Sequence, residues 1–225
     1  MTESMARVVG ILVDSFLPLL KAGIMFTVPL AIISFVLGIL IAFVVAIIRI
    51  SRFKTLSRIA AFYVWIIRGT PLLVQLFIIF YGLPSIGITI NAFISAVIGF
   101  TLSVGAYSSE TIRAAILSVS KGQWEAAHAL GLSRNQALIY VIVPQAFKVA
   151  IPPLANAFIS LVKDTSLAAA ITVTELFRVA QQITARTYEP LWLYIEVAFI
   201  YLIFCSVLSI AQSKLERRFE RHLTL

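Results

Sequence analysis

Charge is scarce in this chain of 225 residues, and most of the charge that is present has one sign. Only 12% of the residues are charged and 60% are hydrophobic, with 18 lysines and arginines against 10 aspartates and glutamates. Soluble globular domains are nearer to half apolar and about a quarter charged. Together with a mean hydropathy of +1.00, this composition excludes an ordinary soluble protein and indicates a chain that lies mostly within a lipid bilayer.

Cysteine and histidine are also rare, and a phosphate-binding loop is missing. The single cysteine, Cys205, can form no internal disulfide, and its apolar neighbours in the sequence predict a buried, inert thiol. Neither of the two histidines has metal-ligand spacing around it, so we expect no metal site. No G-x4-G-K-[ST] segment occurs in the sequence, so we do not expect the chain to bind or hydrolyse ATP itself.

Long apolar runs predict an all-α membrane protein, because about 20 such residues cross a bilayer as a helix. Four runs are long enough on their own: 22–48, 91–117, 149–171 and 191–213. The segment 1–21 resembles a signal peptide in its short apolar run, but Asp14 interrupts the run and no A-x-A-like site follows. We therefore expect 1–21 to be a retained amphipathic segment at the membrane surface.

A fifth run, 57–83, is interrupted by Arg68-Gly69-Thr70-Pro71. Because proline lacks an amide proton and clashes with the preceding turn, we do not expect a straight helix through Pro71. The pattern predicts an interfacial elbow ending near Ile67, followed by a short crossing from Pro71 to about Leu83. The sequence thus predicts five spans in a single membrane domain, and a count of five cannot divide into the two equal inverted halves of common secondary transporters.

Lysine and arginine gather on alternate connections, and this sets the expected orientation. In a five-span arrangement the basic connections and the C-terminal tail share one side, so we expect the N-terminus outside and the C-terminus in the cytoplasm. The basic residues then mark the cytoplasmic face of the bilayer, and no nucleic-acid partner is expected. The residues concerned are Arg49, Arg52, Lys54, Arg58 and Arg68, then Arg113, Lys121, Arg134 and Lys148, and in the tail Lys214, Arg217, Arg218 and Arg221.

The longest cytoplasmic connection, 121–144, carries a dense pattern of small and helix-favouring residues. We expect Glu125, Ala126 and Ala127 to open a short helix that Gly131 ends or bends, because glycine adopts a left-handed backbone at low cost. Pro144 would then set the angle at which the next span leaves. Small side chains let another surface approach the backbone of this segment closely.

Polar residues inside the spans must face protein or a water-filled cavity. Asn156, Ser160 and Asp164 are spaced by four and share one helix face, which we expect to line a solute path. Lys163 and Asp164 lie about 100° apart around a helix and cannot pair with each other. We hypothesise that Asp164 receives the ammonium group of the substrate; the alternative is a structural tie.

Two further intramembrane features need separate interpretations. Glu110 and Arg113 are three residues apart, which favours a structural ion pair at the cytoplasmic end of their span over a gate or an ATPase contact. Glu196 has no role that the sequence indicates.

Three segments together resemble the polar amino acid permease family of binding-protein-dependent ABC importers, over roughly Gly23–Arg218. One is the pattern E-A-A-x3-G-x9-I-x-L-P beginning at Glu125, with Val141 and Val143 in place of the usual Ile and Leu. The others are Arg68-Gly-Thr-Pro71-Leu-Leu-Val-Gln75-Leu-Phe and Leu161-Val-Lys163-Asp164-Thr165-Ser166-Leu167.

The resemblance implies the five-helix core of a type I ABC importer permease in a bacterial plasma (inner) membrane. It implies a dimer with an identical or sister permease subunit, two ATPase subunits that bind ATP and Mg²⁺ at the inner face, and an external solute-binding protein. The residues implied in ATPase coupling are Lys121, Gly122, Gln123, Glu125, Ala126, Ala127, Gly131 and Pro144. Those implied in the substrate path are Thr27, Ser103, Tyr107, Asn156, Ser160, Asp164, Thr165 and Ser166, and those with a structural role are Arg68, Gly69, Pro71, Glu110, Arg113 and Lys163.

The substrate is a polar amino acid by the same resemblance. Some family members have an acidic residue at the position of Ala157, and its absence here disfavours a cationic substrate. The run 158–169 with Glu175-Leu-Phe-Arg178 and Ala180-Gln181 looks most like the cystine branch, so L-cystine is favoured. Glutamine, glutamate or another polar amino acid remains the alternative, followed by an ATP-independent secondary transporter or channel and by a non-transporting membrane scaffold.

Overall fold

The computed structural model describes residues 2–220, and every regular element in that range is helical. Four helical runs are long and apolar enough to cross a membrane: Met5–Ile50, Ala92–Ser118, Arg134–Ile171 and Pro190–Lys214. A fifth crossing is counted when the broken pair Lys54–Gly69 and Leu72–Ile86 is taken as one span. The all-helical class is therefore as expected, with four or five candidate spans.

The chain forms two compact units, and it enters each of them three times. The first unit comprises Met1–Phe35, Pro71–Phe100 and Phe158–Ala211, and the second comprises Val36–Thr70, Thr101–Ala157 and Gln212–Leu225. Each unit therefore assembles helices that are distant in the sequence.

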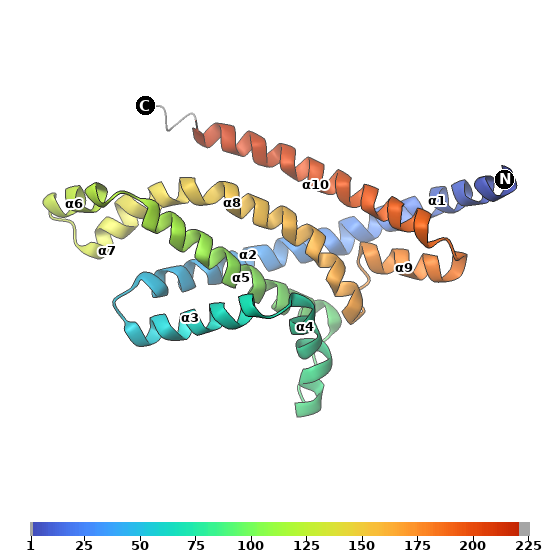
Figure 1. Ribbon diagram of the computed structural model, residues 1–225, viewed down its shortest axis with the longest axis horizontal. Coiled ribbons are helices and arrows are strands. Elements are labelled where there is room, and N and C mark those ends of the chain that lie inside the picture. The colour runs from blue at the N-terminus through green and yellow to red at the C-terminus, as the bar shows by residue number, and fades with distance from the viewer. Residues whose placement is uncertain (1, 221–225) are drawn as a thin grey trace. The chain divides into compact units, whose positions relative to one another are not determined.

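The first helical run does not divide where the sequence suggested. Helix α1 (Thr2–Ala22) continues through a π-helical turn (Gly23–Thr27) into α2 (Val28–Ile50), as the blue ribbon in Figure 1 shows. The helix is continuous across the boundary expected between 1–21 and 22–48, because no strong helix breaker lies at that point. Gly23 has a packing role instead, since a Cβ there would lie 2.6 Å from a ring carbon of Phe204. The surface location of 1–21 stays a prediction.

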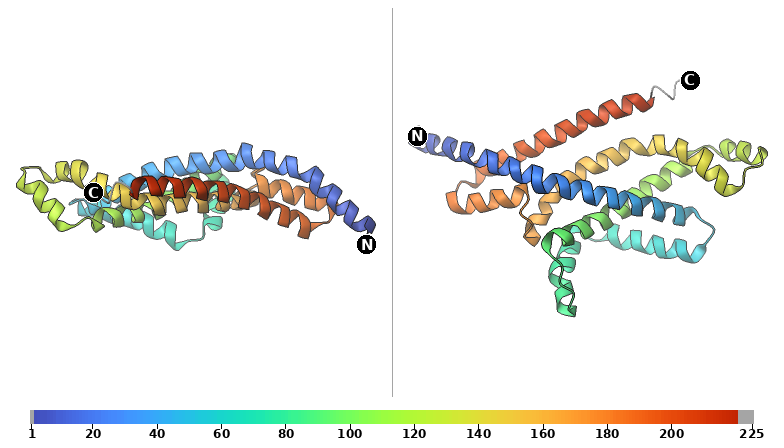
Figure 2. Two further views of the ribbon diagram at one scale, coloured as in Figure 1. Left: turned by 90° about the horizontal axis from the view of Figure 1, so that it is seen from above. Right: turned by 180° about the vertical axis from the view of Figure 1, so that it is seen from behind.

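In the first unit, α9 (Leu176–Thr187) lies along α1 and against the start of α10 (Pro190–Glu220), which is visible in Figure 1 and in the right-hand view of Figure 2. The buried side chains between them are Leu19, Leu176, Ala180, Val197 and Ile200. Burial of such side chains contributes about 25 cal/mol per Å² of apolar surface. This cluster fixes the connection that precedes the last span.

The interruption at Arg68–Pro71 is present. Helix α3 (Lys54–Gly69) ends before Thr70, whose backbone is extended, as is usual for a residue that precedes proline. Pro71 then precedes α4 (Leu72–Phe77), a π-helical turn (Ile78–Gly82) and a 3-10 turn (Leu83–Ile86). The expected elbow therefore starts earlier than 57 and is a full helix of 16 residues.

In the second unit, α3 runs antiparallel to the end of α2, and both pack against the later part of α5 (Ala92–Ser118). Figure 2 shows the α2–α3 hairpin from behind. Small residues permit the close approach: a Cβ at Gly105 would lie 2.7 Å from the hydroxyl oxygen of Tyr63 and 2.8 Å from a methyl carbon of Ile41. The buried alanines at 42, 46, 115, 146 and 150 have the same effect in the neighbouring cluster.

The segment 121–144 forms α6 (Lys121–Ala129), α7 (Arg134–Ala137) and a π-helical turn (Leu138–Ile142) before α8 (Val143–Asp164). One expectation is wrong here. Helix α6 begins at Lys121, so Glu125 lies within it rather than opening it. The helical run Arg134–Ile171 continues through Pro144 into the expected span, and the angle that Pro144 sets stays a prediction. The wider π turn just before Pro144 accommodates its ring and its missing amide proton.

The helix type also changes near the end of the expected span 149–171. Helix α8 stops at Asp164, and Thr165–Ile171 is a 3-10 helix that ends at Thr172 in the left-handed region, with φ of 66°. The tighter winding brings Thr165, Ala168 and Ala169 into the interior of the first unit.

Candidate functional site

The turn after α6 is the best-defined part of the expected coupling segment. Gly131 has φ of +79°, its N–H donates to the His128 carbonyl at 2.9 Å, and the Leu132 N–H donates to the Ala127 carbonyl at 3.1 Å. This pair of hydrogen bonds is a Schellman motif, in which glycine is favoured because it lacks a Cβ. The expectation that Gly131 ends the helix is confirmed.

The surface of α6 is open along most of the expected coupling residues. Lys121, Gly122, Gln123, Glu125, Ala126, Gly131 and Pro144 are exposed. Ala127 is an exception, because only 2% of its surface is accessible. Gln123 accepts a hydrogen bond from the Nε2 group of Gln145 at 3.0 Å. This bond ties α6 to the beginning of α8.

Glu110 is the centre of an ion cluster that is larger than the expected pair. Arg113 donates to Glu110 Oε2 through Nε at 3.0 Å and through Nη2 at 2.9 Å, so the i, i+3 pair is present. Arg49 pairs with the other carboxylate oxygen, and Arg68 Nη1 lies 3.9 Å from that oxygen. The Arg68 guanidinium also stacks over the ring of Tyr107, with its carbon 5.3 Å from the ring centroid. The cluster joins α2, α3 and α5 within the second unit.

The sequence analysis did not identify Arg49 as a partner of Glu110, although the sequence contained a signal for this ion pair. Glu110 is the only acid in 91–117, and an acid in a span needs partners. A search for cations at the ends of neighbouring spans would have included Arg49. Of the other expected structural residues, Pro71 caps α4 and Gly69 ends α3, where a Cβ would meet no atom within 4 Å.

The polar residues expected to share a face of α8 are exposed within the described range. Asn156, in the second unit, is exposed and accepts a hydrogen bond from Gln212 Nε2 at 3.1 Å. Ser160 and Asp164, in the first unit, are exposed. Lys163 is exposed too, and no ion pair within 4.0 Å links it or Asp164 to any residue in the described range. An exposed carboxylate on an apolar span is unusual enough to need a ligand or a partner subunit.

The other residues expected in the path differ from these in burial. Thr27 is fully buried, and its Oγ1 accepts a hydrogen bond from the Leu176 N–H at 3.3 Å. Thr165 is also fully buried and donates to the Val162 carbonyl at 2.7 Å. Both threonines are thus engaged within the chain, and their place in the path stays a prediction. Ser103 is partly buried, and Tyr107, half-exposed, stacks with Arg68.

Ser166 lies at a cavity of about 580 Å³ in the first unit, together with Lys163, Tyr201 and Cys205. The expectation of a buried Cys205 is wrong, since its thiol is partly exposed at this cavity. The remaining lining is apolar, with side chains from α9 and α10.

Glu175 is a buried acid to which the sequence analysis assigned no role of its own. It is fully buried before α9, and its Oε1 accepts from the Arg178 N–H at 2.7 Å. Its Oε2 accepts from the Phe177 N–H at 2.9 Å and from the Tyr201 hydroxyl at 3.0 Å. Burial raises the pKa of Glu175 to about 7, against the opposing effect of these hydrogen bonds. Glutamate is an uncommon helix cap, which explains why no pattern indicated it.

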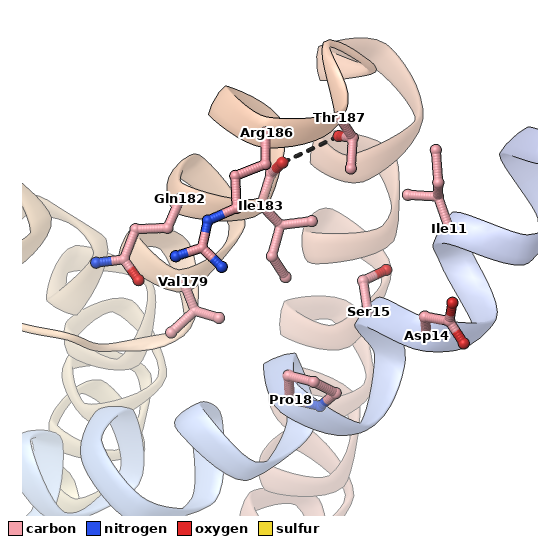
Figure 3. Close-up of a pocket in the computed structure, with 9 residues that line it drawn as sticks. All are labelled: Ile11, Asp14, Ser15, Pro18, Val179, Gln182, Ile183, Arg186 and Thr187. Carbon is pink, nitrogen blue, oxygen red and sulfur yellow. Dashed lines mark hydrogen bonds between the residues drawn. The ribbon is translucent and has the colours of Figure 1, made fainter.

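Glu196 acquires a partner in the structure. The buried Ser15 hydroxyl donates to Glu196 Oε2 at 2.6 Å, so α1 is tied to α10. Next to Ser15 a cavity of about 390 Å³ opens between α1 and α9, with Asp14 from α1 and Arg186 from α9 at its walls (Figure 3). Near this end of α9, Arg7 donates to the Thr187 carbonyl at 2.9 Å.

Comparison with known proteins relates this arrangement to a transport family. The chain is 54% identical over 211 residues to the L-cystine transport system permease protein TcyB of Bacillus subtilis (strain 168), covering 93% of this chain and 90% of that protein. It is 38% identical to the glutamine transport system permease protein GlnP of Escherichia coli (strain K12), covering 90% of this chain and 93% of that protein.

A solved structure shows that the fold is shared as well. The crystal structure of an amino acid ABC transporter with histidines matches with a TM-score of 0.86 and 37% identity, over 92% of this chain and 96% of that one. The fold is therefore that of a type I ABC importer permease. Residues 34–221 match the family described as binding-protein-dependent transport system inner membrane component, and the chain belongs to that family.

Proposed function

We propose that the chain is the permease subunit of an ABC importer for a polar L-amino acid, with L-cystine as the favoured substrate. The observation that carries the proposal is the exposed α6 surface closed by the Gly131 Schellman turn, within a chain that belongs to a permease family. L-cystine is favoured because the 54% identical relative is an L-cystine permease. Glutamine is the second candidate, favoured by the identity to a glutamine permease.

The proposal includes the topology and the partners. The N-terminus lies outside, the C-terminus lies in the cytoplasm, and the chain crosses the bacterial inner membrane five times. A second permease subunit, two ATPase subunits and an external solute-binding protein complete the importer. The ATPase subunits bind ATP and Mg²⁺ and dock on α6, whose rigid-body displacement acts on the spans.

Orientation is tested by cysteine labelling of intact cells. With Cys205 replaced by serine, a cysteine introduced at Glu125 should react with a membrane-impermeant maleimide only after the membrane is permeabilised. Labelling of Glu125→Cys in intact cells would place α6 outside and end the proposal that ATPase subunits dock on it.

The substrate class is tested on the assembled importer in vesicles. Uptake of L-cystine should require internal ATP and the solute-binding protein, and it should survive collapse of the ion gradients. Competition with L-glutamine distinguishes the two candidates, because the preferred amino acid should suppress uptake of the other. Uptake without ATP would indicate a secondary transporter instead.

Asp164 is proposed to bind the substrate ammonium group, since it is an exposed acid on α8 with no ion-pair partner in the described range. Asp164→Asn should raise the substrate concentration needed for half-maximal uptake at least roughly tenfold, as expected for loss of a charge-assisted hydrogen bond. The matched control is Asp14→Asn, which removes an exposed acid of α1 and should leave uptake unchanged. Unchanged uptake by a folded Asp164→Asn complex would remove Asp164 from the path.

A further inference from the structure

A cavity of about 550 Å³ lies in the second unit, where the α2–α3 turn meets α6 and α7. Its floor is apolar and includes Ile47 and Ile50 from α2, Trp124 from α6 and Leu138, all of which pack on the buried cluster beneath. Its rim is polar and basic, with Arg52 from the turn and Arg134 from the first position of α7. The volume lies in the range of about 300–1,000 Å³ that small ligands occupy.

The charge of this rim is uncompensated. Arg52 and Arg134 are both exposed, and neither has an ion pair within 4.0 Å to any residue in the described part of the chain. No acidic side chain is among the lining residues, whose remaining polar members are Ser51, Ser133 and Asn135. Two guanidinium groups with hydroxyl and amide donors suit a phosphate group, because guanidinium and phosphate form paired, charge-assisted hydrogen bonds.

An apolar stripe on α2 leads to this cavity. Along α2, Val36, Leu40 and Val44 are exposed, with 54%, 62% and 55% of their surfaces accessible. They are spaced by four, so they form one stripe, and Ile47 continues it into the cavity floor. The stripe belongs to a helical run that is apolar enough to span a bilayer. The cavity therefore joins an exposed apolar stripe on a candidate span to a basic rim at the end of that span.

We propose that this cavity binds the headgroup of an anionic phospholipid. Arg52 and Arg134 hold its phosphate, and an acyl chain lies along the stripe from Val36 to Ile47. Basic pockets at the ends of membrane spans bind anionic headgroups in this way. Phe53, which lines the cavity beside Arg52 and is 71% exposed, adds apolar surface for the lipid to cover.

A phospholipid fits these observations better than a free phosphate ion or a polypeptide. A free phosphate would use the rim and leave the apolar floor and the stripe uncovered. A docked protein segment would need acidic side chains for the rim and would have no reason to follow α2 into the bilayer. The lipid satisfies both parts with one molecule, and it would link the α2–α3 turn to the coupling segment.

The test uses the assembled importer with its full-length chain, purified in a neutral detergent. The test variant is Arg52→Gln with Arg134→Gln. The matched control is Lys54→Gln with Arg58→Gln, which removes the same charge from exposed positions of α3 outside the cavity. Each protein is titrated with phosphatidylglycerol, phosphatidylcholine or inorganic phosphate, and bound lipid is counted by native mass spectrometry alongside the thermal unfolding temperature.

We expect phosphatidylglycerol to bind to the unaltered importer and the control and to raise their unfolding temperature, with little effect of phosphatidylcholine. The test variant should bind phosphatidylglycerol roughly 30-fold more weakly, since each arginine near an anionic surface contributes about a factor of five. A charge-conserving variant, Arg52→Lys with Arg134→Lys, should retain most of the binding and guards against loss of folding as the explanation.

Three results would overturn the proposal. Equal weakening in the test variant and the control would show general attraction to basic surface rather than a site. Saturation by inorganic phosphate with no further effect of lipid would assign the rim to a free anion. Loss of the ATPase subunits from the test variant, with phosphatidylglycerol binding unchanged, would assign this face to a protein contact.

Discussion

We predict that Glu175 makes the stability of the first unit depend on pH in the neutral range. Its carboxyl is fully buried, and burial raises the pKa from 4.5 to about 7. Because the pKa is higher in the folded chain than in the unfolded chain, the folded state favours the protonated form. The stabilisation is complete below about pH 4.5 and is lost as the pH rises through 7. The difference between the two pKa values corresponds to about 3 kcal/mol of unfolding free energy.

Replacement of Glu175 by glutamine tests this reasoning, because the amide oxygen still accepts a hydrogen bond and no longer ionises. The unfolding temperature of the purified importer should fall between pH 5 and pH 8, whereas that of Glu175→Gln should stay nearly level. The variant should be the less stable protein at pH 5, where one N–H group loses its acceptor, and the more stable one above pH 8.

A second variant should shift the pH at which the stabilisation is lost, without abolishing the pH dependence. The hydroxyl of Tyr201 donates to Glu175 and so stabilises the ionised form. Tyr201→Phe should therefore move the loss of stability to higher pH. Equal pH profiles for the unaltered protein and Glu175→Gln, measured by tryptophan fluorescence during heating, would refute the assignment of this titration to Glu175.

The remaining predictions also concern stability, measured as unfolding temperatures of the purified importer. Gly131→Ala should destabilise by about 1 kcal/mol because of the φ of +79°, whereas Gly122→Ala, inside α6 with open space around it, should stabilise; the same sign for both would contradict the turn geometry. Glu110→Gln should lower the free energy of unfolding by about 2 kcal/mol, because it leaves arginines without a carboxylate. Adding Arg49→Gln should recover part of this stability. Additive losses from the two substitutions would show that Arg49 and Glu110 do not interact. Gly105→Ala should cost about 1–3 kcal/mol, because its Cβ would meet a tyrosine hydroxyl oxygen at 2.7 Å, and a neutral effect would show that α3 and α5 are less tightly packed.

The sequence predicted those parts of the fold that depend on local chemistry. Apolar runs indicated where the long helices lie, and α5 at Ala92–Ser118 is within one residue of the expected 91–117. The runs Met5–Ile50 and Arg134–Ile171 begin well before the expected 22 and 149, because polar residues extend a helix as readily as apolar ones. Proline chemistry located the interruption at Pro71. Glycine chemistry located the turn at Gly131. In each case the deciding interaction lies within a few residues of the chain.

Features that depend on contacts between distant segments could not be predicted in this way. Thr27 carries the same hydroxyl whether it faces a path or a neighbouring N–H, and the acceptor role became clear only when Leu176 was placed beside it. Arg49 and Glu110 are 61 positions apart by their numbers, so no local pattern joins them. Glu175 is buried through contacts with α10, and its sequence neighbours do not indicate that burial.

In the proposed function, α8 connects the coupling segment to Asp164 through one continuous helical run. A single helical run, Arg134–Ile171, begins in α7 beside the Gly131 turn and includes Asp164. A helix transmits an axial displacement along its hydrogen-bonded backbone without needing side-chain contacts on the way. Pro152 and Pro153 remove two of those hydrogen bonds near the middle of α8. Displacement of α7 would therefore reach Asp164 as a change in the bend of α8 at these prolines, because this is where its backbone resists bending least.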